Sequence, residues 1–251
     1  MRVIAIDGPA ASGKSSTAAG VARRLGWAHL DSGALYRALT LAALDNLGAP
    51  AGGTDAPWSA SQLLSLAEGL PVRLVLAADV FRPAVAGVGV EDAIRSERVT
   101  RRVSALAAIP AVRHWVNVQQ REAALDHPEG VVVDGRDIGT VVFPDAPLKV
   151  FLTASPEERA RRRLAQRGSG AAGGGGGAGR GEGAGAGNTA IDQAELAREA
   201  TALAARDHAD ATRSIAPLRA AADAVLLDTT RLSLDEQVTR VVALARERFP
   251  Q

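Results

Sequence analysis

The segment that decides the fold is Gly8-Pro9-Ala10-Ala11-Ser12-Gly13-Lys14-Ser15. It matches the pattern G-x-x-x-x-G-K-[ST] of a phosphate-binding loop. Before it lies Met1–Ile6, a mostly apolar run with β-branched residues that predicts a buried strand. After it, Ala, Val and Leu recur at helical spacing from Lys14 to Leu25, and Gly26 ends the run. Strand, glycine-rich loop and helix, in this order, are the context that the pattern requires.

The loop predicts binding of a nucleoside triphosphate. Its glycines let backbone N–H groups turn toward a phosphate, and the N-terminus of the following helix adds positive partial charge. We expect Lys14 to span the β- and γ-phosphates and Ser15 to ligate Mg²⁺. Lysine is rare here, since Lys14 and Lys149 are the only two, so its place in the loop stands out. The alternative is a glycine turn with an exposed lysine, which the flanking strand and helix disfavour.

Composition excludes several classes of protein. The 251 residues carry 29 basic and 28 acidic side chains and a net charge of +1, whereas nucleic-acid-binding domains usually show a larger basic excess. The absence of cysteine excludes disulfides, thiol catalysis and cysteine-based metal sites. No run approaches the roughly 20 apolar residues that span a bilayer, and the first apolar run is too short for a secretory signal. We therefore expect a cytoplasmic protein without nucleic-acid or membrane partners.

The rest of the chain alternates between helical and strand patterns, which indicates an α/β protein with a central parallel sheet flanked by helices. Helices are expected over Ser32–Leu47, Ser59–Glu68, Ala93–Ala108, Pro110–Leu125, Pro156–Arg167, Ile191–Thr212 and Leu234–Arg248, and strands over Gly130–Val133, Leu148–Leu152 and Ala224–Leu227. Alternating apolar residues in Pro71–Val90 predict a small antiparallel sheet inserted beside the main domain. Ser169–Gly187 is almost wholly Gly and Ala and should be a mobile loop, because it cannot offset its ordering entropy.

Phosphate-binding loops occur in kinases, motors, GTPases and ATPases, so the loop alone does not decide the activity. A GTPase would need an N/T-K-x-D element, which the surroundings of Lys149 do not provide, and an oligomeric ATPase would usually be longer. Arginines are instead spread through several segments, and their planar, forked side chains are suited to clamp the phosphates of two facing nucleotides. These arginines are Arg37, Arg113, Arg136, Arg159, Arg162, Arg163, Arg206 and Arg213.

Three further motifs resemble one family. They are Asp31-Ser32-Gly33-Ala34-Leu35-Tyr36-Arg37, Asp134-Gly135-Arg136-Asp137-Ile138-Gly139-Thr140, which continues through Val141–Pro147, and Arg206-Asp207-x-x-Asp210-x-x-Arg213. In this order, and together with the insertion at Pro71–Val90, they resemble the bacterial cytidylate kinases over nearly the whole chain. The departure is Ser169–Gly187, where that family usually has a shorter and more polar lid segment.

The resemblance implies a P-loop NTPase fold with a small inserted antiparallel sheet and a mobile lid, in a single kinase domain over residues 1–251. It implies ATP-dependent phosphorylation of CMP and dCMP to CDP and dCDP in pyrimidine nucleotide metabolism, with Mg²⁺, by a monomer. It divides the chain into a core (1–31, 128–155 and 222–251), an acceptor region (32–127, with the insertion near 71–90) and a lid region (156–214, with a Gly-rich loop at 168–188).

The resemblance also assigns roles to residues. ATP would be held by Gly8, Pro9, Ala10, Ala11, Ser12, Gly13, Lys14, Ser15 and Ser16, and Mg²⁺ by Ser15 and, through water, Asp134. Lys14, Arg159, Arg162 and Arg163 would act on the transferring phosphoryl group. For CMP, Ser32, Arg37 and Arg136 would hold the phosphate, Ser104, Arg113 and Asp137 would recognise the cytosine, Arg206 and Asp210 would contact the sugar, and Tyr36 and Arg213 would complete the site.

The chemistry of the base agrees with these roles. Asp137 and Ser104 can accept hydrogen bonds from the cytosine amino group, while Arg113 donates to its ring acceptors. Uracil would present a carbonyl to the carboxylate and leave buried polar groups unpaired, which disfavours it.

Simpler interpretations remain open for several residues. Asp31 and Ser32 precede a helix, so their sole role could be that of an N-cap. Asp134 could merely cap the end of a strand. Arg161, Arg162 and Arg163 could form a solvated helix face, and for Arg161 we expect this position. The four histidines, His29, His114, His127 and His208, have no metal-ligand spacing and are expected to be structural, and Trp27, Trp58 and Trp115 to pack.

Two other functions also remain open. One is a kinase for another nucleoside monophosphate or for a non-nucleotide metabolite. The other is a nucleotide-binding regulatory module, which would bind ATP or GTP tightly without acceptor-dependent ADP release and would leave the arginines without a purpose.

Overall fold

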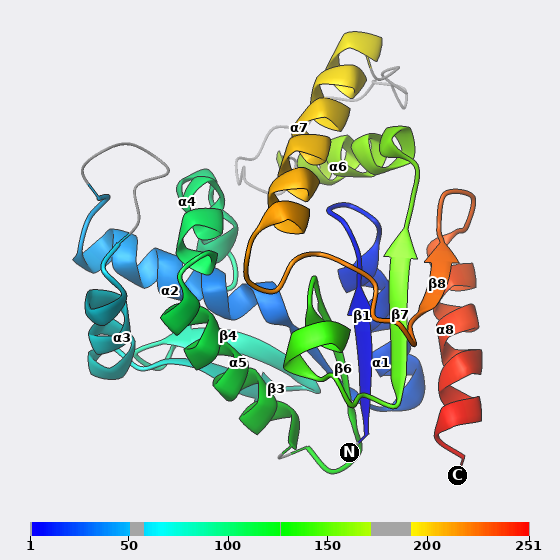
Figure 1. The fold of residues 1–251 in the computed structure, drawn as a ribbon, viewed down its shortest axis with the longest axis horizontal. Helices are drawn as coiled ribbons and strands as arrows, with labels where there is room; N and C mark the ends of the chain where they lie inside the picture. The colour runs from blue at the N-terminus through cyan, green and yellow to red at the C-terminus, as the bar shows by residue number, and fades with distance from the viewer. Residues whose placement is uncertain (1, 51–57, 126, 172–191, 251) are drawn as a thin grey trace, which may run out of the picture.

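The computed structural model describes residues 2–50, 58–125, 127–171 and 192–250. Helices surround one central sheet, and two further helices stand above one end of it (Figure 1). Residues 172–187 of the predicted mobile loop Ser169–Gly187 lie outside the described residues.

The helices and strands have the following bounds. The strands are β1 Val3–Asp7, β2 Ala28–Asp31, β3 Val72–Ala77, β4 Val80–Val85, β5 Val88–Gly89, β6 Val131–Gly135, β7 Leu148–Thr153 and β8 Val225–Asp228. The α-helices are α1 Lys14–Leu25, α2 Ser32–Asn46, α3 Ala60–Gly69, α4 Glu97–Ala107, α5 Pro110–Leu125, α6 Pro156–Ala171, α7 Gln193–Thr212 and α8 Leu234–Arg248, with a 3₁₀ turn η1 Ala93–Arg95 and a π-helical turn η2 Ile138–Val142.

The predicted α/β class is confirmed. Within the described residues one sheet has the strand order β3-β4-β2-β6-β1-β7-β8, with β5 paired to β4. The pairs from β4 through β2, β6, β1 and β7 to β8 are all parallel. Because α-helical crossovers connect parallel strands, the carboxyl ends of β1, β6 and β7 meet at one edge, where ligands bind in folds of this class.

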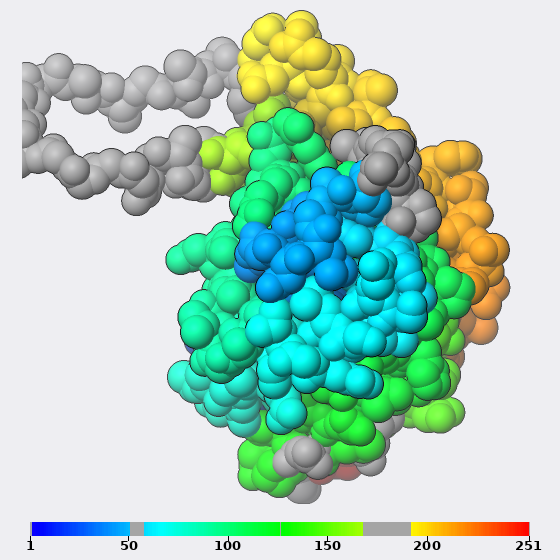
Figure 2. All heavy atoms as spheres, turned by 90° about the vertical axis from the view of Figure 1, so that its left-hand side faces the viewer, coloured from blue at the N-terminus to red at the C-terminus, as the bar shows by residue number. Residues whose placement is uncertain are grey.

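The insertion at Pro71–Val90 forms an antiparallel pair, β3 and β4, as predicted, but it does not stand apart from the main sheet. His29 and Leu30 of β2 pair in parallel with Val80 and Phe81 of β4, which makes the insertion an extension of the central sheet. In Figure 2 the residues of α3 and β3–β5 (cyan) cover one face of the molecule, with α7 (yellow) above them. The sequence analysis did not predict β2, which spans only four residues and gives little periodicity.

Strand β1 is covered on both of its faces, which explains why helices lie on both sides of the central sheet. Ile4 and Ile6 point toward α1 and α8 and pack with Val21 and Val241, whereas Val3 and Ala5 pack on the opposite side with residues of β2, β6, α5 and η2. A strand that is covered on both faces is apolar throughout, as strands in parallel sheets are. This burial anchors β1, and with it the start of the phosphate loop.

Most expected elements appear within two residues of their predicted ends, and α5 and α8 have the predicted bounds. The expected helix Ala93–Ala108 is broken: Ser96 has an extended backbone and separates η1 from α4. Helix α6 extends beyond Arg167 to Ala171.

Trp27 and Trp58 are buried, in agreement with the prediction that they pack. In the described parts of the chain, the helices are all too short or too polar to cross a membrane.

Gly130 lies at the start of β6 in a conformation that few side chains adopt, with φ +123°, and a Cβ atom there would lie 2.7 Å from the Trp27 ring. Trp27 is only 6% exposed and packs edge-on against Phe249, so the ring has little room to move. Gly130→Ala should therefore lower the free energy of unfolding by about 3 kcal/mol, from strain and overpacking together. Urea denaturation measures this loss.

Gly48→Ala is the matched control. Gly48 also has a positive φ, +72°, but an added Cβ meets no atom within 4 Å, so only backbone strain remains, at about 1 kcal/mol. Equal losses of unfolding free energy in Gly130→Ala and Gly48→Ala would contradict the steric explanation for Gly130.

Candidate active site

Helices α6 and α7 stand above the carboxyl ends of β1, β6 and β7 (Figure 1), and the predicted site residues come from this edge of the sheet and from helices around it. The phosphate loop follows β1 and leads into α1. Gly8 has φ +149°, and a Cβ there would overlap the carbonyl oxygen of Leu152 on β7. Gly13, with φ +96°, is the N-cap of α1. Only glycine satisfies both positions without strain, which explains the glycines of the motif.

Lys14 is folded back over this loop. Its Nζ donates to the carbonyl oxygen of Pro9 at 2.6 Å. Burial and, after it, the positive charge of Arg136 together lower the pKa of Lys14 to about 7, against the opposing effects of Asp134, Asp7 and Asp207. The lysine is thus held where it can receive a phosphate, and its charge depends on the anions around it.

Ser15, Asp134 and His29 form a chain of polar contacts beside Lys14. Ser15 Oγ donates to Asp134 Oδ2 at 2.5 Å, and His29 Nε2 lies 2.7 Å from Asp134 Oδ1. Burial by itself lowers the pKa of His29, but the hydrogen bond and the charge of Asp134 outweigh it and raise the pKa. Asp134 therefore contacts the phosphate loop and does more than cap its strand.

His29 is a residue whose place the sequence analysis missed, since it was expected to be structural. No spacing signal could reveal it, because 105 positions separate His29 from Asp134 and only the parallel pairing of β2 with β6 brings the two together.

The Ser15 hydroxyl and the Asp134 carboxylate suit a magnesium ion, which prefers oxygen ligands and keeps several waters. No cluster of three or more His, Asp or Glu side chains that could hold a metal occurs within the described segments. A site with so few protein ligands fits Mg²⁺ that is bound mainly by nucleotide phosphates and water.

The three lid arginines share one face of α6, at positions i, i+3 and i+4. Arg159 is buried and donates to the carbonyl oxygen of Ala10 at 3.2 Å. Arg163 lines a cavity of about 730 Å³ together with Lys14 and Ser15. Arg161 lies outside this face with a side chain that is 54% exposed, in agreement with the expected solvated position.

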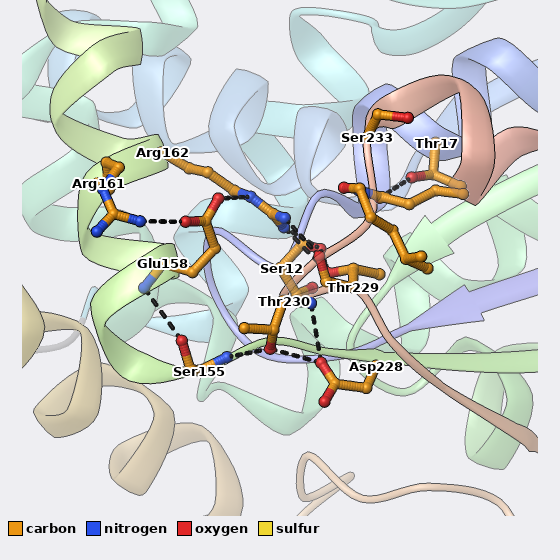
Figure 3. Close-up of polar contacts among 12 residues, drawn as sticks. Ser12, Thr17, Ser155, Glu158, Arg161, Arg162, Asp228, Thr229, Thr230 and Ser233 are labelled. Atoms are coloured by element: carbon orange, nitrogen blue, oxygen red, sulfur yellow. Dashed lines mark hydrogen bonds and ion pairs between the residues drawn. The ribbon is translucent and has the colours of Figure 1, made fainter.

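Arg162 joins three parts of the fold, as Figure 3 shows. Its Nη2 donates to the Thr229 carbonyl oxygen at 2.7 Å, and its Nη1 donates to Thr229 Oγ1 at 3.0 Å and to the Ser12 carbonyl oxygen at 3.3 Å. Glu158 accepts from its Nε. Arg162 thus lies against the outside of the phosphate loop and fastens it to the β8–α8 connection, and its proposed action on the phosphoryl group stays a prediction.

A second cavity, of about 430 Å³, is lined in part by Arg136 and shares no lining residue with the first. Every residue that was expected to hold CMP lines it: Ser32, Tyr36, Arg37, Ser104, Arg113, Arg136, Asp137, Arg206, Asp210 and Arg213. These residues come from α2, α4, α5, α7 and the end of β6. Asp31 next to them caps α2 by accepting from the Gly33 N–H at 2.9 Å, as the N-cap interpretation predicts, whereas Ser32 faces the cavity.

Charged pairs hold the walls of this cavity. Arg113 Nη2 lies 2.5 Å from Asp137 Oδ2, with both side chains less than 10% exposed, and Arg213 Nη2 lies 3.8 Å from Asp137 Oδ1. Arg136 Nε lies 2.7 Å from Asp210 Oδ2. Arg37 donates to Thr100 Oγ1 at 3.0 Å. The pairs fix the directions of these side chains and place guanidinium groups and carboxylates around one space.

Several buried polar atoms in the cavity wall lack a hydrogen-bond partner among the described residues. They are the Tyr36 hydroxyl, Arg113 Nε and Arg213 Nη2. Since an unpaired buried donor costs about 1–3 kcal/mol, such atoms favour a polar ligand that pairs with them.

Asp7 holds the segment that follows Asp137, a residue of the cavity wall. Its buried carboxylate accepts from the N–H groups of Ile138 and Gly139 at 2.9 and 2.7 Å, and burial raises its pKa to about 6. These two residues begin η2, directly after Asp137. The residue before the phosphate loop thus also fixes the segment that carries Asp137, a link of 131 positions that the sequence did not reveal.

The chain matches the family model described as "Cytidylate kinase" over residues 4–173 and 183–247. Proteins named cytidylate kinase are similar to it: one from Pseudomonas fluorescens strain Pf-5 is 41% identical over 251 residues, and one from Azotobacter vinelandii strain DJ is 43% identical over 243. A third, from Pseudomonas paraeruginosa strain PA7, is 43% identical over 242 residues. Each alignment covers 96% of this chain and 93% of the relative. With this coverage, the chain belongs to the cytidylate kinase family.

Proposed function

We propose that the protein transfers the γ-phosphoryl group of ATP to CMP and dCMP, giving ADP together with CDP or dCDP. The observation that carries the proposal is the cavity of about 430 Å³, because ten separated residues expected to hold CMP all line it. Arg136 lines this cavity and also donates to the carbonyl oxygen of Gly8 in the phosphate loop at 3.4 Å. Two nucleotides bound in the two sites would therefore meet at their phosphates.

The donor would lie on residues 8–16. The loop's N–H groups, Lys14 and the lid arginines would bind its phosphates, and Ser15 with Asp134 would hold Mg²⁺, the latter through water. When bound, Mg²⁺ supplies positive charge that neutralises the donor's phosphates. The short Ser15–Asp134 contact supports this pairing of roles.

Selection of cytosine would rest on Asp137 and Arg113. Their pair presents a carboxylate oxygen and an unpaired Nε at the cavity, which suits a base with an amino donor beside ring acceptors. Ser104 lines the same wall and offers a further acceptor.

The transfer needs no strong general base, because the attacking oxygen of the CMP phosphate is already ionised near neutral pH. A bond forms between this oxygen and the γ-phosphorus while the bond to the bridging oxygen of ATP breaks, and the electron pair leaves with ADP. The protein's part is to align the two nucleotides and to neutralise their charge. Closure of the lid over both would exclude water and prevent ATP hydrolysis.

We further propose that residues 1–251 act as one kinase domain, with the core, acceptor and lid regions given above, in the cytoplasm and as a monomer. The continuous sheet supports a single domain, and the net charge of +1 argues against nucleic-acid partners.

An acceptor panel tests the activity. With ATP and Mg²⁺, a coupled assay should detect rapid ADP release with CMP or dCMP, and much slower release with UMP, AMP or no acceptor. Fast release with AMP but not CMP would indicate another monophosphate kinase, and nucleotide binding without release on any acceptor would indicate a regulatory module.

Asp137→Asn tests base selection. The amide puts a donor where the carboxylate accepts from the cytosine amino group, so the CMP/UMP ratio of kcat/KM should fall by about 10- to 100-fold. The Kd for ATP should stay within about threefold of the wild-type value, because Asp137 lines the cavity of about 430 Å³ that we propose for CMP, here called the acceptor cavity. An unchanged ratio would remove Asp137 from base recognition.

Lys14 should take up a proton when ATP binds. Since its pKa in the protein is about 7, the amine is largely neutral at pH 8, and phosphate charge raises the pKa of a nearby lysine. Calorimetry in buffers of different ionisation enthalpy should show uptake approaching about one proton per ATP at pH 8 and little at pH 6. Lys14→Arg, which stays charged, should abolish the uptake, and persistent uptake in that variant would assign it to another group.

A further inference from the structure

Asp207 belongs to the motif around Arg206 and Asp210, yet no role followed from the sequence. In the fold, its carboxylate, on α7, makes contacts to three other segments. Oδ1 accepts from the backbone N–H of Ala10 at 2.9 Å, Oδ2 pairs with Arg159 Nη1, and Arg136 Nη1 lies 3.6 Å from Oδ1. These contacts link the phosphate loop, the lid helix α6 and the end of β6.

Ala10 is held on both sides. Asp207 accepts from its N–H, and Arg159 donates to its carbonyl oxygen at 3.2 Å. Because Arg159 is itself paired with Asp207, the two side chains form one clasp around a single residue of the phosphate loop. We call these three residues, Asp207, Arg159 and Ala10, the Ala10 clasp.

The clasp is shielded from water. The side chains of Asp207 and Arg159 are 16% and 9% exposed. An exposed ion pair stabilises little, whereas a carboxylate with several donors in a buried place makes strong, directed hydrogen bonds. The pair therefore fixes the guanidinium of Arg159, whose long side chain would otherwise sample many rotamers.

The carboxylate also lies among cations that repel one another. The charge of Arg136 lowers the pKa of Lys14, and that of Asp207 acts in the opposite direction. A negative charge between the lid arginine and the acceptor arginine reduces the cost of holding both near the phosphate loop.

We propose that Asp207 is a positioning residue, which orients Arg159 and the Ala10 amide at the phosphate loop and keeps both in register with Arg136 at the acceptor cavity. The proposal rests on the proposed phosphoryl transfer. Asp207 would act through Arg159 and the loop and not by touching the nucleotides. Its contribution would then appear mainly in the chemical step, because misdirected charges stabilise the transition state less well while substrates still bind.

Asp207→Asn tests this role, since it keeps the shape and one acceptor oxygen but removes the charge that pairs with Arg159. With CMP and ATP, kcat should fall by about 10- to 100-fold, while both KM values change by less than about threefold. The matched control is Glu199→Gln, which removes a different ion pair between α7 and α6, that of Glu199 with Arg167, without touching the phosphate loop. This control should retain a kcat within about twofold of the wild-type value.

A second readout does not depend on turnover. NMR measures how fast the Ala10 amide proton exchanges with solvent. In Asp207→Asn, which lacks the charged acceptor, the exchange should be about tenfold faster than in the wild type. In Glu199→Gln it should keep the wild-type rate. Circular dichroism gives the folded fraction by which kcat is normalised. If Asp207→Asn does not fold, Asp207→Glu replaces it, because the longer side chain keeps the charge but displaces Arg159, and the same fall in kcat is expected.

The outcomes separate the two proposals. A wild-type protein that releases no ADP with CMP refutes the phosphoryl transfer itself. An active wild type together with an Asp207 variant of normal kcat refutes the positioning role. Equal losses of kcat in Asp207→Asn and Glu199→Gln also refute it, because they would show that α7 needs only its attachment to α6.

Discussion

The constraint on which the structure depends is electrostatic: many positive charges must stay together at one edge of a parallel sheet. Lys14, Arg136 and Arg159 lie around the phosphate loop, and their mutual repulsion is evident in the pKa of Lys14, which burial and Arg136 lower to about 7. The carboxylates of Asp134, Asp7 and Asp207 act in the opposite direction and raise the pKa of Lys14. The fold therefore brings acidic residues to the same edge as the basic ones, and the site is a mixed array of both signs.

Contacts of this array also link the phosphate loop with the second cavity. Asp7 ends β1 just before the phosphate loop and holds the start of η2, which follows Asp137 in the acceptor cavity. Arg136 pairs with Asp210 on one side and approaches Gly8 on the other. The contacts of Asp7 and Arg136 therefore connect the phosphate loop with the residues of the second cavity. For a reaction that depends on the alignment of two nucleotides, such links matter as much as the groups that contact the phosphates.

The insertion β3–β4 has a part in this arrangement that its sequence did not suggest. It was expected beside the main domain, but it extends the central sheet through β2. His29, which pairs with Val80 of the insertion, also contacts Asp134 at the phosphate loop. The insertion therefore supports the strand that positions His29, and the pairing explains why a residue expected to be structural lies in the site.

The amino-acid sequence alone was enough to predict the phosphate loop, most of the helices and strands other than β2, the antiparallel character of the insertion and, through the family resemblance, the ten residues that line the second cavity. Loop, strand and helix signals are local, so glycine positions and hydrophobic periodicity define them without reference to the rest of the chain, and the acceptor residues followed from motifs shared with a family. Only the tertiary structure decided which distant residues meet: His29 with Asp134, Asp7 with Ile138, and Asp207 with Ala10, which are 105, 131 and 197 positions apart. Such contacts leave no periodic trace in the sequence, because they depend on strand order and helix packing, which many remote side chains set together.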